Sequence, residues 1–292
     1  MDYIDLNGKL VKNRSGQDKF LAFLYTTALG RMLLKPLVKP WISMAGGKLL
    51  SGRFSIIPIK SFIKKNHIDM SDYEDRKYKS FNDFFTRKII DGKRPIEENN
   101  QVLVSPADGK VTVYQIDENL SLNIKNTSYH LSELLKSKKL AAYFENGYAY
   151  VIRLSVDDYH RYIYPVSGTK TKNYHIKGVF HTVNPVANDY YPIYKENTRE
   201  YTLIHTKDTG NVLMMEVGAL LVGKITNHHG KRAVKCGEEK GYFEFGGSTI
   251  VVLTDRKMPT PRKDLLANTR NGYETKILQG QLLANKEEQN IQ

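Results

Sequence analysis

The feature that most constrains the fold is a series of short apolar runs between Val102 and Leu253. Each run has the length of a strand, is rich in Val, Ile or Leu, and is bounded by residues that favour turns. The runs read KVTVYQI, YAYVIRL, TLIHT, NVLMMEV, ALLVGKI and TIVVL. Asp208-Thr209-Gly210-Asn211 separates two of them and predicts a hairpin turn. Because no helix pattern alternates regularly with the runs, we predict a largely antiparallel β core.

The N-terminal part of the chain predicts helices instead. Apolar residues at helical spacing indicate a helix over 20–34, with Asp18 as its N-cap and Pro36 and Pro40 ending it or bending the chain. A second helix is predicted over 80–90, with Ser80 as its N-cap and three phenylalanines on its core-facing side. The predicted fold class is therefore α+β, with a helical N-terminal region on a largely antiparallel β catalytic core.

The basic residues are concentrated in the same N-terminal part of the chain. Residues 1–95 contain 19 Lys and Arg and 9 Asp and Glu, so they carry +10 of the total net charge of +13. This pattern is open to three interpretations: nucleic-acid binding, contact with an anionic membrane, or ordinary helices with solvated lysines. The basic residues are interleaved with large apolar ones, as in RMLLKPLVKPW, and no RNP-like, KH-like or zinc-finger pattern is present. Such stretches suit helices that lie in a lipid interface.

Other sequence signals limit the compartment and the chemistry. The N-terminus is acidic and polar and does not predict a secretory signal. The apolar stretch 20–34 is shorter than the roughly 20 residues of a membrane span and contains Arg31. The single cysteine, Cys236, excludes an intramolecular disulfide. No HExxH or CxxC pattern is present, so no metal site is predicted.

Gly246-Gly247-Ser248-Thr249 is the most informative motif for chemistry. The Ser248 hydroxyl can attack the carbonyl of Gly247, which has no Cβ to crowd the approach. Taken alone, the same residues are typical of a β-turn. A serine-hydrolase elbow of the form Gly-x-Ser-x-Gly is absent, because Ile250 stands where its second glycine would be.

Four motifs in order resemble the phosphatidylserine decarboxylase family. They are FNDFFTRK (81–88), SPADGK (105–110), DDYHR (157–161) and KGYFEFGGSTIVVL (240–253). The resemblance implies an enzyme, a carboxy-lyase, that cuts itself between Gly247 and Ser248. It implies that Ser248 becomes a covalent pyruvoyl group, which forms a Schiff base with phosphatidylserine and releases phosphatidylethanolamine and carbon dioxide.

The resemblance also implies partners and organisation. Residues 1–95 would form a basic, membrane-associating region, and residues 96–292 the pyruvoyl decarboxylase core. The products 1–247 and 248–292 would stay associated at the cytoplasmic side of the cell membrane, as a peripheral protein without nucleic acid and compatible with a homo-oligomer. Two alternatives remain at this point: a pyruvoyl-dependent decarboxylase of a soluble amino acid, and a non-enzymatic basic nucleic-acid-binding protein.

The same resemblance assigns catalytic roles to Asp108 and His160 beside Ser248. Many family members have a second histidine three residues after the first, where this chain has Ile163. Isoleucine cannot transfer protons, so three possibilities stay open. His160 serves both self-cleavage and decarboxylation, another histidine such as His175 or His181 replaces the missing one, or processing is slow or absent.

Overall fold

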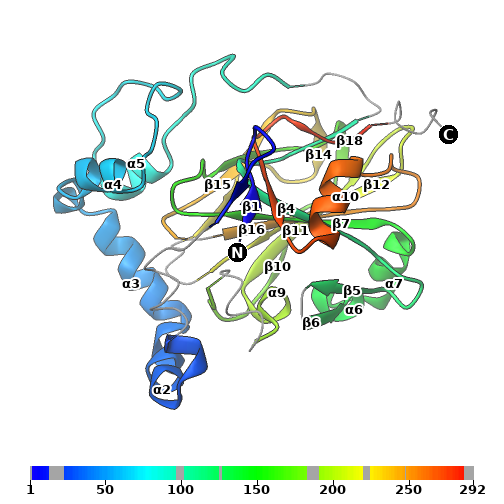
Figure 1. Cartoon of the computed structure of the whole chain (residues 1–292), viewed down its shortest axis with the longest axis horizontal. Helices are drawn as coiled ribbons and strands as arrows, with labels where there is room; N and C mark the ends of the chain where they lie inside the picture. The colour runs from blue at the N-terminus through cyan, green and yellow to red at the C-terminus, as the bar shows by residue number, and fades with distance from the viewer. Residues whose placement is uncertain are drawn as a thin grey trace.

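The computed structural model describes residues 2–12, 23–96, 102–124, 127–182, 191–219, 224–246 and 248–285. Figure 1 shows the β-strands gathered on one side of the molecule, with helices α2 to α4 extending away from them as an arm. Asp18, Gly247 and the tail beyond Asn285 lie outside the described residues.

An 11-stranded sheet forms the centre of the β region, and β16 and β7 occupy its middle. Neighbouring strands of the described sheet run antiparallel except β1 and β17, which pair in parallel. In spatial order the strands are β14 (Arg232–Val234), β9 (Gly168–Lys170), β11 (Arg199–His205), β12 (Asn211–Val217), β16 (Ser248–Thr254), β7 (Tyr148–Leu154), β4 (Gly109–Gln115), β17 (Glu274–Ile277), β1 (Tyr3–Ile4) and β2 (Leu10–Val11), with β10 (Tyr174–Ile176) beside β11.

Smaller sheets and short helices complete the fold. The smaller sheets are β13–β15–β8 (Ile225–Asn227, Glu239–Phe243, Arg161–Ile163), β18–β3 (Leu282–Asn285, Val102–Val104) and β5–β6 (Ser121–Ile124, Thr127–His130). The helices are α2 (Ala28–Leu37), α3 (Pro40–Leu50), η1 (Arg53–Ile56), α4 (Ile59–Lys65), α5 (Phe81–Phe85), α6 (Leu131–Leu135), α7 (Lys138–Ala141), η2 (Ala142–Phe144), α9 (Ile193–Glu196) and α10 (Lys263–Arg270). No helix in the described parts of the chain is long and apolar enough to cross a membrane.

Each face of the large sheet is covered by its own apolar core. One core joins the sheet to α2, α6 and α7 and includes Leu34, Val151 and Val251. The other joins it to β8, β15 and α10 and includes Tyr162, Phe243 and Val252. Successive residues of β7 and β16 alternate between the two cores and are buried on both faces, which explains their continuous apolar sequences.

The structure confirms the predicted α+β class and the antiparallel core. Five of the six predicted runs form strands, and Asp208–Asn211 connects β11 to β12 as a hairpin with Gly210 at a φ of 96°. The sixth run, ALLVGKI, reaches a strand only at Ile225, and residues 220–223 are outside the described part.

Two helix predictions need correction. The helix predicted over 20–34 is interrupted at Thr27, whose side chain caps α2 by accepting a hydrogen bond from the Gly30 N–H, and α2 continues to Leu37. The helix predicted over 80–90 ends at Phe85. Ser80 is its N-cap as predicted, but Ile89 forms a β-bridge with Tyr73 and draws the chain into an extended conformation.

A buried ion pair joins the small β13–β15–β8 sheet to the large sheet. The Lys240 ammonium lies 2.8 Å from the Glu216 carboxylate, both side chains are 0% exposed, and Lys240 also donates to Asn227 over 2.6 Å. Burial raises the pKa of Glu216, while the Lys240 charge opposes that rise. Removing either partner leaves a charged or polar group buried without its complement.

We predict that Lys240→Met lowers the free energy of unfolding by about 3–5 kcal/mol, because Glu216 loses its cation. Adding Glu216→Gln to Lys240→Met should recover part of that loss, since position 216 then no longer carries an unpaired buried carboxylate. Urea unfolding followed by circular dichroism measures both effects, in a Ser248→Ala background that keeps the chain in one piece. Strictly additive losses would contradict the coupling.

Candidate active site

The predicted site residues gather where several strands of the large sheet begin or end. Ser248 is the first residue of β16 and pairs with Leu154, the last residue of β7. The loop from Ser155 to His160 leaves β7 at this point, and Asp108 directly precedes β4, which pairs with β7. The antiparallel arrangement thus brings three motifs that are distant in sequence to the same end of the central strands β16, β7 and β4.

Ser248 is fully buried, and its Oγ has no hydrogen-bond partner among the described residues. A buried hydroxyl without a partner is uncommon and is available for chemistry. Gly246, two residues before it, has a φ of 139°, a conformation that favours glycine. The turn before Ser248 therefore depends on a glycine at 246.

His160 lies beside this turn. Its ring is fully buried, and its Nδ1 donates to the Asp158 carbonyl over 2.9 Å. That bond fixes the neutral tautomer with an unprotonated Nε2, which has no hydrogen-bond partner among the described residues. Burial lowers the pKa of His160 to about 4, although the nearby carbonyls of Asp158 and Gly246 oppose the shift. His160 is thus a neutral imidazole at physiological pH, with a free lone pair next to the glycine turn.

Helix α5 holds both the histidine and the turn in place. The Phe85 ring packs on the His160 ring at a centroid distance of 4.1 Å and also contacts Phe245. The Asn82 side chain accepts a hydrogen bond from the Phe245 N–H over 3.1 Å. The phenylalanines predicted to face the core therefore build the apolar wall of the site.

Asp158 anchors the loop that carries His160. Its side chain is 1% exposed, accepts from the Ser155 N–H over 2.7 Å, and forms ion pairs with Lys110 and Lys276. The two lysine charges hold the pKa of Asp158 well below its usual range despite burial. Asp158 lies within the DDYHR motif but is not among the residues predicted from the sequence to act at the site.

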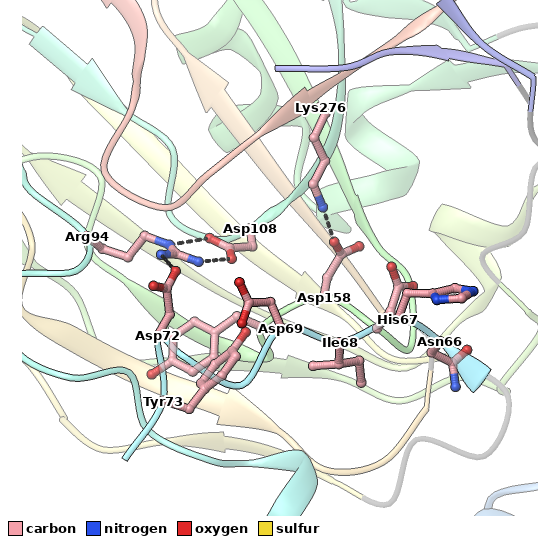
Figure 2. Close-up of a pocket in the computed structure, with 12 residues that line it drawn as sticks. Asn66, His67, Ile68, Asp69, Asp72, Tyr73, Arg94, Asp108, Asp158 and Lys276 are labelled. Carbon is pink, nitrogen blue, oxygen red and sulfur yellow. Dashed lines mark hydrogen bonds and ion pairs between the residues drawn. The ribbon is translucent and has the colours of Figure 1, made fainter. Parts of the chain in front are cut away.

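Asp108 belongs to a separate ion-pair group. Its carboxylate accepts from Arg94 over 2.9 Å and from the backbone N–H of Gln279 over 2.8 Å, and no hydrogen bond joins it to His160 in the described structure. Arg94 also pairs with Asp72 over 2.8 Å. Figure 2 shows Asp108 and Asp158 on the wall of one pocket, each facing its own cation.

The two alternative histidines have other surroundings. His175 is exposed on β10, 3.9 Å from Glu200. His181 is buried, contacts the Tyr25 hydroxyl at 3.2 Å and stacks on Tyr191 at 4.5 Å. Burial lowers the pKa of His181 to about 4. The contacts of both histidines are with other parts of the described chain, whereas His160 lies beside the glycine turn, so the geometry favours His160 as the base.

Comparison with known proteins identifies the family of the chain. The family model described as phosphatidylserine decarboxylase matches residues 81–285. The chain belongs to the phosphatidylserine decarboxylase family. It is 47% identical over 262 residues to phosphatidylserine decarboxylase proenzyme 2 of Clostridium acetobutylicum, which covers 89% of this chain and 90% of that protein.

Two further relatives extend the similarity over most of the chain. The phosphatidylserine decarboxylase proenzyme of Fusobacterium nucleatum is 39% identical, with 91% of each chain covered. The corresponding proenzyme of Clostridium tetani is 37% identical, with 92% of each chain covered. The family resemblance inferred from four motifs is thus confirmed, and it reaches into the N-terminal region.

We predict that His160 titrates near pH 4 rather than near 6.5, because burial disfavours its charged form. As the pH falls through about 4, Nε2 becomes protonated and the base is lost. Nuclear magnetic resonance of the imidazole in uncut Ser248→Ala protein measures this pKa directly.

Two matched variants identify the aspartate that acts on the ring. Asp158→Asn removes a negative charge that raises the pKa of His160, so the pKa should fall further. Asp108→Asn should leave the pKa of His160 unchanged, because Asp108 is paired with Arg94 and with the backbone N–H of Gln279. Titration near 6.5 in the parent protein, or an equal shift in both variants, would contradict this assignment.

Proposed function

We propose that this chain is a self-cleaving phosphatidylserine decarboxylase whose pyruvoyl group is made from Ser248. The observation that carries the proposal is a buried Ser248 hydroxyl without a partner at the glycine turn, next to a neutral His160 whose lone pair is free. A residue to be converted into a prosthetic group needs such freedom, and the surrounding apolar wall excludes water. The residues present therefore fit the formation of a pyruvoyl group at this position.

In self-cleavage, His160 accepts the Ser248 hydroxyl proton as Oγ attacks the Gly247 carbonyl. The peptide C–N bond breaks, the Ser248 nitrogen takes up a proton, and an ester joins the two residues. Loss of the Ser248 α-proton and cleavage of its Cβ–Oγ bond then release residue 247 as a carboxylate. The resulting dehydroalanine reacts with water and loses ammonia, which leaves a ketone at position 248.

In decarboxylation, the pyruvoyl group supplies a carbonyl that condenses with the substrate amine and withdraws electrons as carbon dioxide leaves. The described residues exclude water, orient the substrate and supply protons. His160 is the proton-transfer residue in this proposal, and Asp108 supports the site electrostatically from the pocket wall. The product is phosphatidylethanolamine.

The two cleavage products would stay associated because the smaller one is built into the large sheet. Residues 248–292 contribute β16, which pairs with β12 on one side and β7 on the other. They also contribute β17, which pairs with β4, and β18, which pairs with β3. Separation would break all these ladders and expose both cores, so the 96–292 core would remain one body.

The N-terminal region would bind the anionic membrane surface as a peripheral element. Large apolar side chains are exposed along α2, α3, η1 and the residue after it, although α2 already buries Leu34 in the core. This exposed set comprises Leu29, Met32, Leu33, Trp41, Leu49, Phe54, Ile56 and Ile57. Exposed basic residues flank it: Lys35, Lys39, Lys48, Arg53, Lys60, Lys64 and Lys65. Apolar insertion combined with basic contacts suits a phosphatidylserine-containing surface.

We predict that purified protein contains two pieces, residues 1–247 and the 45-residue piece 248–292, which separate only on denaturation. Intact-mass measurement identifies them, and the smaller piece should resist Edman sequencing because a pyruvoyl group has no free amine. Ser248→Ala should give one uncut chain without activity. Thr254→Val, at the other end of β16, is the matched control and should still be cut. A single uncut chain with full activity would refute the proposal.

His160→Ala distinguishes the two steps within the same assay. Loss of a general base typically slows a reaction about 10²- to 10⁴-fold. Accumulation of uncut chain places His160 in self-cleavage, whereas normal cleavage without product places it in decarboxylation. Parent-like behaviour in both steps would remove His160 from the mechanism.

We predict that Phe54→Glu weakens binding to vesicles that contain phosphatidylserine by about 10-fold or more, because Phe54 is 84% exposed and burying its ring in lipid contributes about 1.5–3 kcal/mol. Parent binding should also weaken as salt rises, since each basic contact contributes about 1 kcal/mol before screening. Vesicle co-sedimentation measures both effects. Tyr143→Glu, at an exposed aromatic outside this region, is the matched control. Equal parent binding to vesicles without anionic lipid would count against the electrostatic part.

A further inference from the structure

Arg87 is a fully buried cation immediately after helix α5. Its side chain is 0% exposed. The guanidinium carbon lies 4.3 Å from the centre of the Tyr73 ring and 5.0 Å from that of Phe84. The Nη2 atom makes two long contacts, 3.4 Å to the Tyr73 hydroxyl and 3.5 Å to the Asp157 carbonyl. The two rings thus hold the guanidinium between them by cation–π interactions.

The other donors of this guanidinium are unused. Nε and Nη1 are buried and have no hydrogen-bond partner among the described residues, and no described carboxylate forms an ion pair with Arg87. A buried positive charge without an anion is costly, and such groups concentrate at functional sites. Arg87 therefore presents two directed N–H groups that suit an anionic oxygen.

Other buried cations among the described residues have an ion pair or several hydrogen bonds. Lys240 faces Glu216 at 2.8 Å, and Arg153 forms a bidentate pair with Glu274, with bonds of 2.8 and 2.6 Å. Arg199 has no carboxylate partner either, yet it donates to four backbone carbonyls. The fold thus satisfies buried cations elsewhere, which sets Arg87 apart.

The position of Arg87 connects the pocket with the catalytic residues. Tyr73 and Asp157, its two contacts, both line the pocket that is shown in Figure 2. Phe85, two residues before Arg87, packs against His160, and the Arg87 charge is near enough to lower the pKa of that histidine. Arg87 is therefore close both to the pocket wall and to the buried imidazole.

We propose that Arg87 binds an anionic oxygen of the phosphatidylserine headgroup, and this inference rests on the proposed function. The serine headgroup has two groups of this chemistry, a carboxylate on the reacting carbon and a phosphodiester. Either accepts hydrogen bonds from the fork of a guanidinium. The headgroup also carries an ammonium group, which the acidic side chains of the same pocket, such as Asp69 and Asp157, complement in charge.

The test compares substrate affinity with self-cleavage in one series of variants. Arg87→Lys keeps a positive charge but loses the fork, and Arg87→Met removes both. We expect cut protein whose KM for phosphatidylserine in detergent micelles is raised about 10- to 100-fold, the usual effect of losing a hydrogen bond to a charged group. The matched control is Arg76→Met, because Arg76 also lies over an aromatic ring, that of Tyr78 at 5.0 Å, but pairs with Asp83.

Soluble headgroups distinguish the two oxygen sources. Glycerophosphoserine and glycerophosphoethanolamine are compared as competitors, because both carry the phosphodiester and only the first carries a carboxylate. If Arg87→Lys raises the inhibition constants of both competitors, Arg87 binds the phosphodiester. If it raises the inhibition constant of glycerophosphoserine alone, Arg87 binds the carboxylate. If KM and both inhibition constants match those of Arg76→Met, the inference is overturned.

Self-cleavage separates this inference from the proposed function. If the parent protein neither cuts itself nor releases carbon dioxide, the proposed function fails first. If the parent does both but folded Arg87→Lys remains uncut, Arg87 acts in self-cleavage and the headgroup role is overturned. If Arg87 variants do not fold, Tyr73→Phe decides, since it removes the hydroxyl contact and keeps the ring. A raised KM in Tyr73→Phe supports the inference, and an unchanged KM overturns it.

Discussion

One buried carboxylate, that of Asp158, joins the segments on which the site depends. It binds Lys110 of β4, Lys276 of β17 and the backbone N–H of Ser155 at the end of β7. Three segments at this end of the strands thus meet at one anion. The backbone carbonyl of Asp158 also sets the tautomer of His160. A buried anion is tolerated here because two cations and a hydrogen bond replace its hydration. The position of the His160 ring therefore follows from the assembly of the sheet.

Burial among apolar side chains sets the protonation state of His160 and the surroundings of the Ser248 hydroxyl. The Phe85 ring on His160 and the Phe245 ring beside it exclude water, so the imidazole stays neutral at physiological pH. A neutral imidazole is the form that accepts a proton. The same burial removes competing hydrogen-bond partners from the Ser248 hydroxyl. Asp158 is thus paired with its two lysines, while the Ser248 hydroxyl and the His160 ring lie among apolar side chains with the Arg87 charge nearby.

The sequence predicts the parts of the fold that depend on local pattern. The strand runs, the hairpin at 208–211 and the N-cap at Ser80 follow from spacing and turn chemistry, and the structure confirms them. The partners of Asp158 could not be predicted in this way, because Lys110 and Lys276 are 48 and 118 residues distant. Arg87 was likewise missed. The FNDFFTRK motif that contains it was recognised. However, its burial against two aromatic rings depends on tertiary packing and cannot be predicted from a basic residue near the end of a helix.

Ile163 shows how the site accommodates its departure from the family pattern. Its side chain packs in an apolar cluster with Val102 and Val104, and its backbone N–H donates to the Pro106 carbonyl, two residues before Asp108. A histidine at 163 would stand on the Asp108 side of the site, where Arg94 balances the aspartate in this chain. In the proposed mechanism, proton transfer is then carried out by His160, beside the glycine turn. One imidazole is sufficient in principle, because the Nε2 that accepts a proton in one step can return it in a later one.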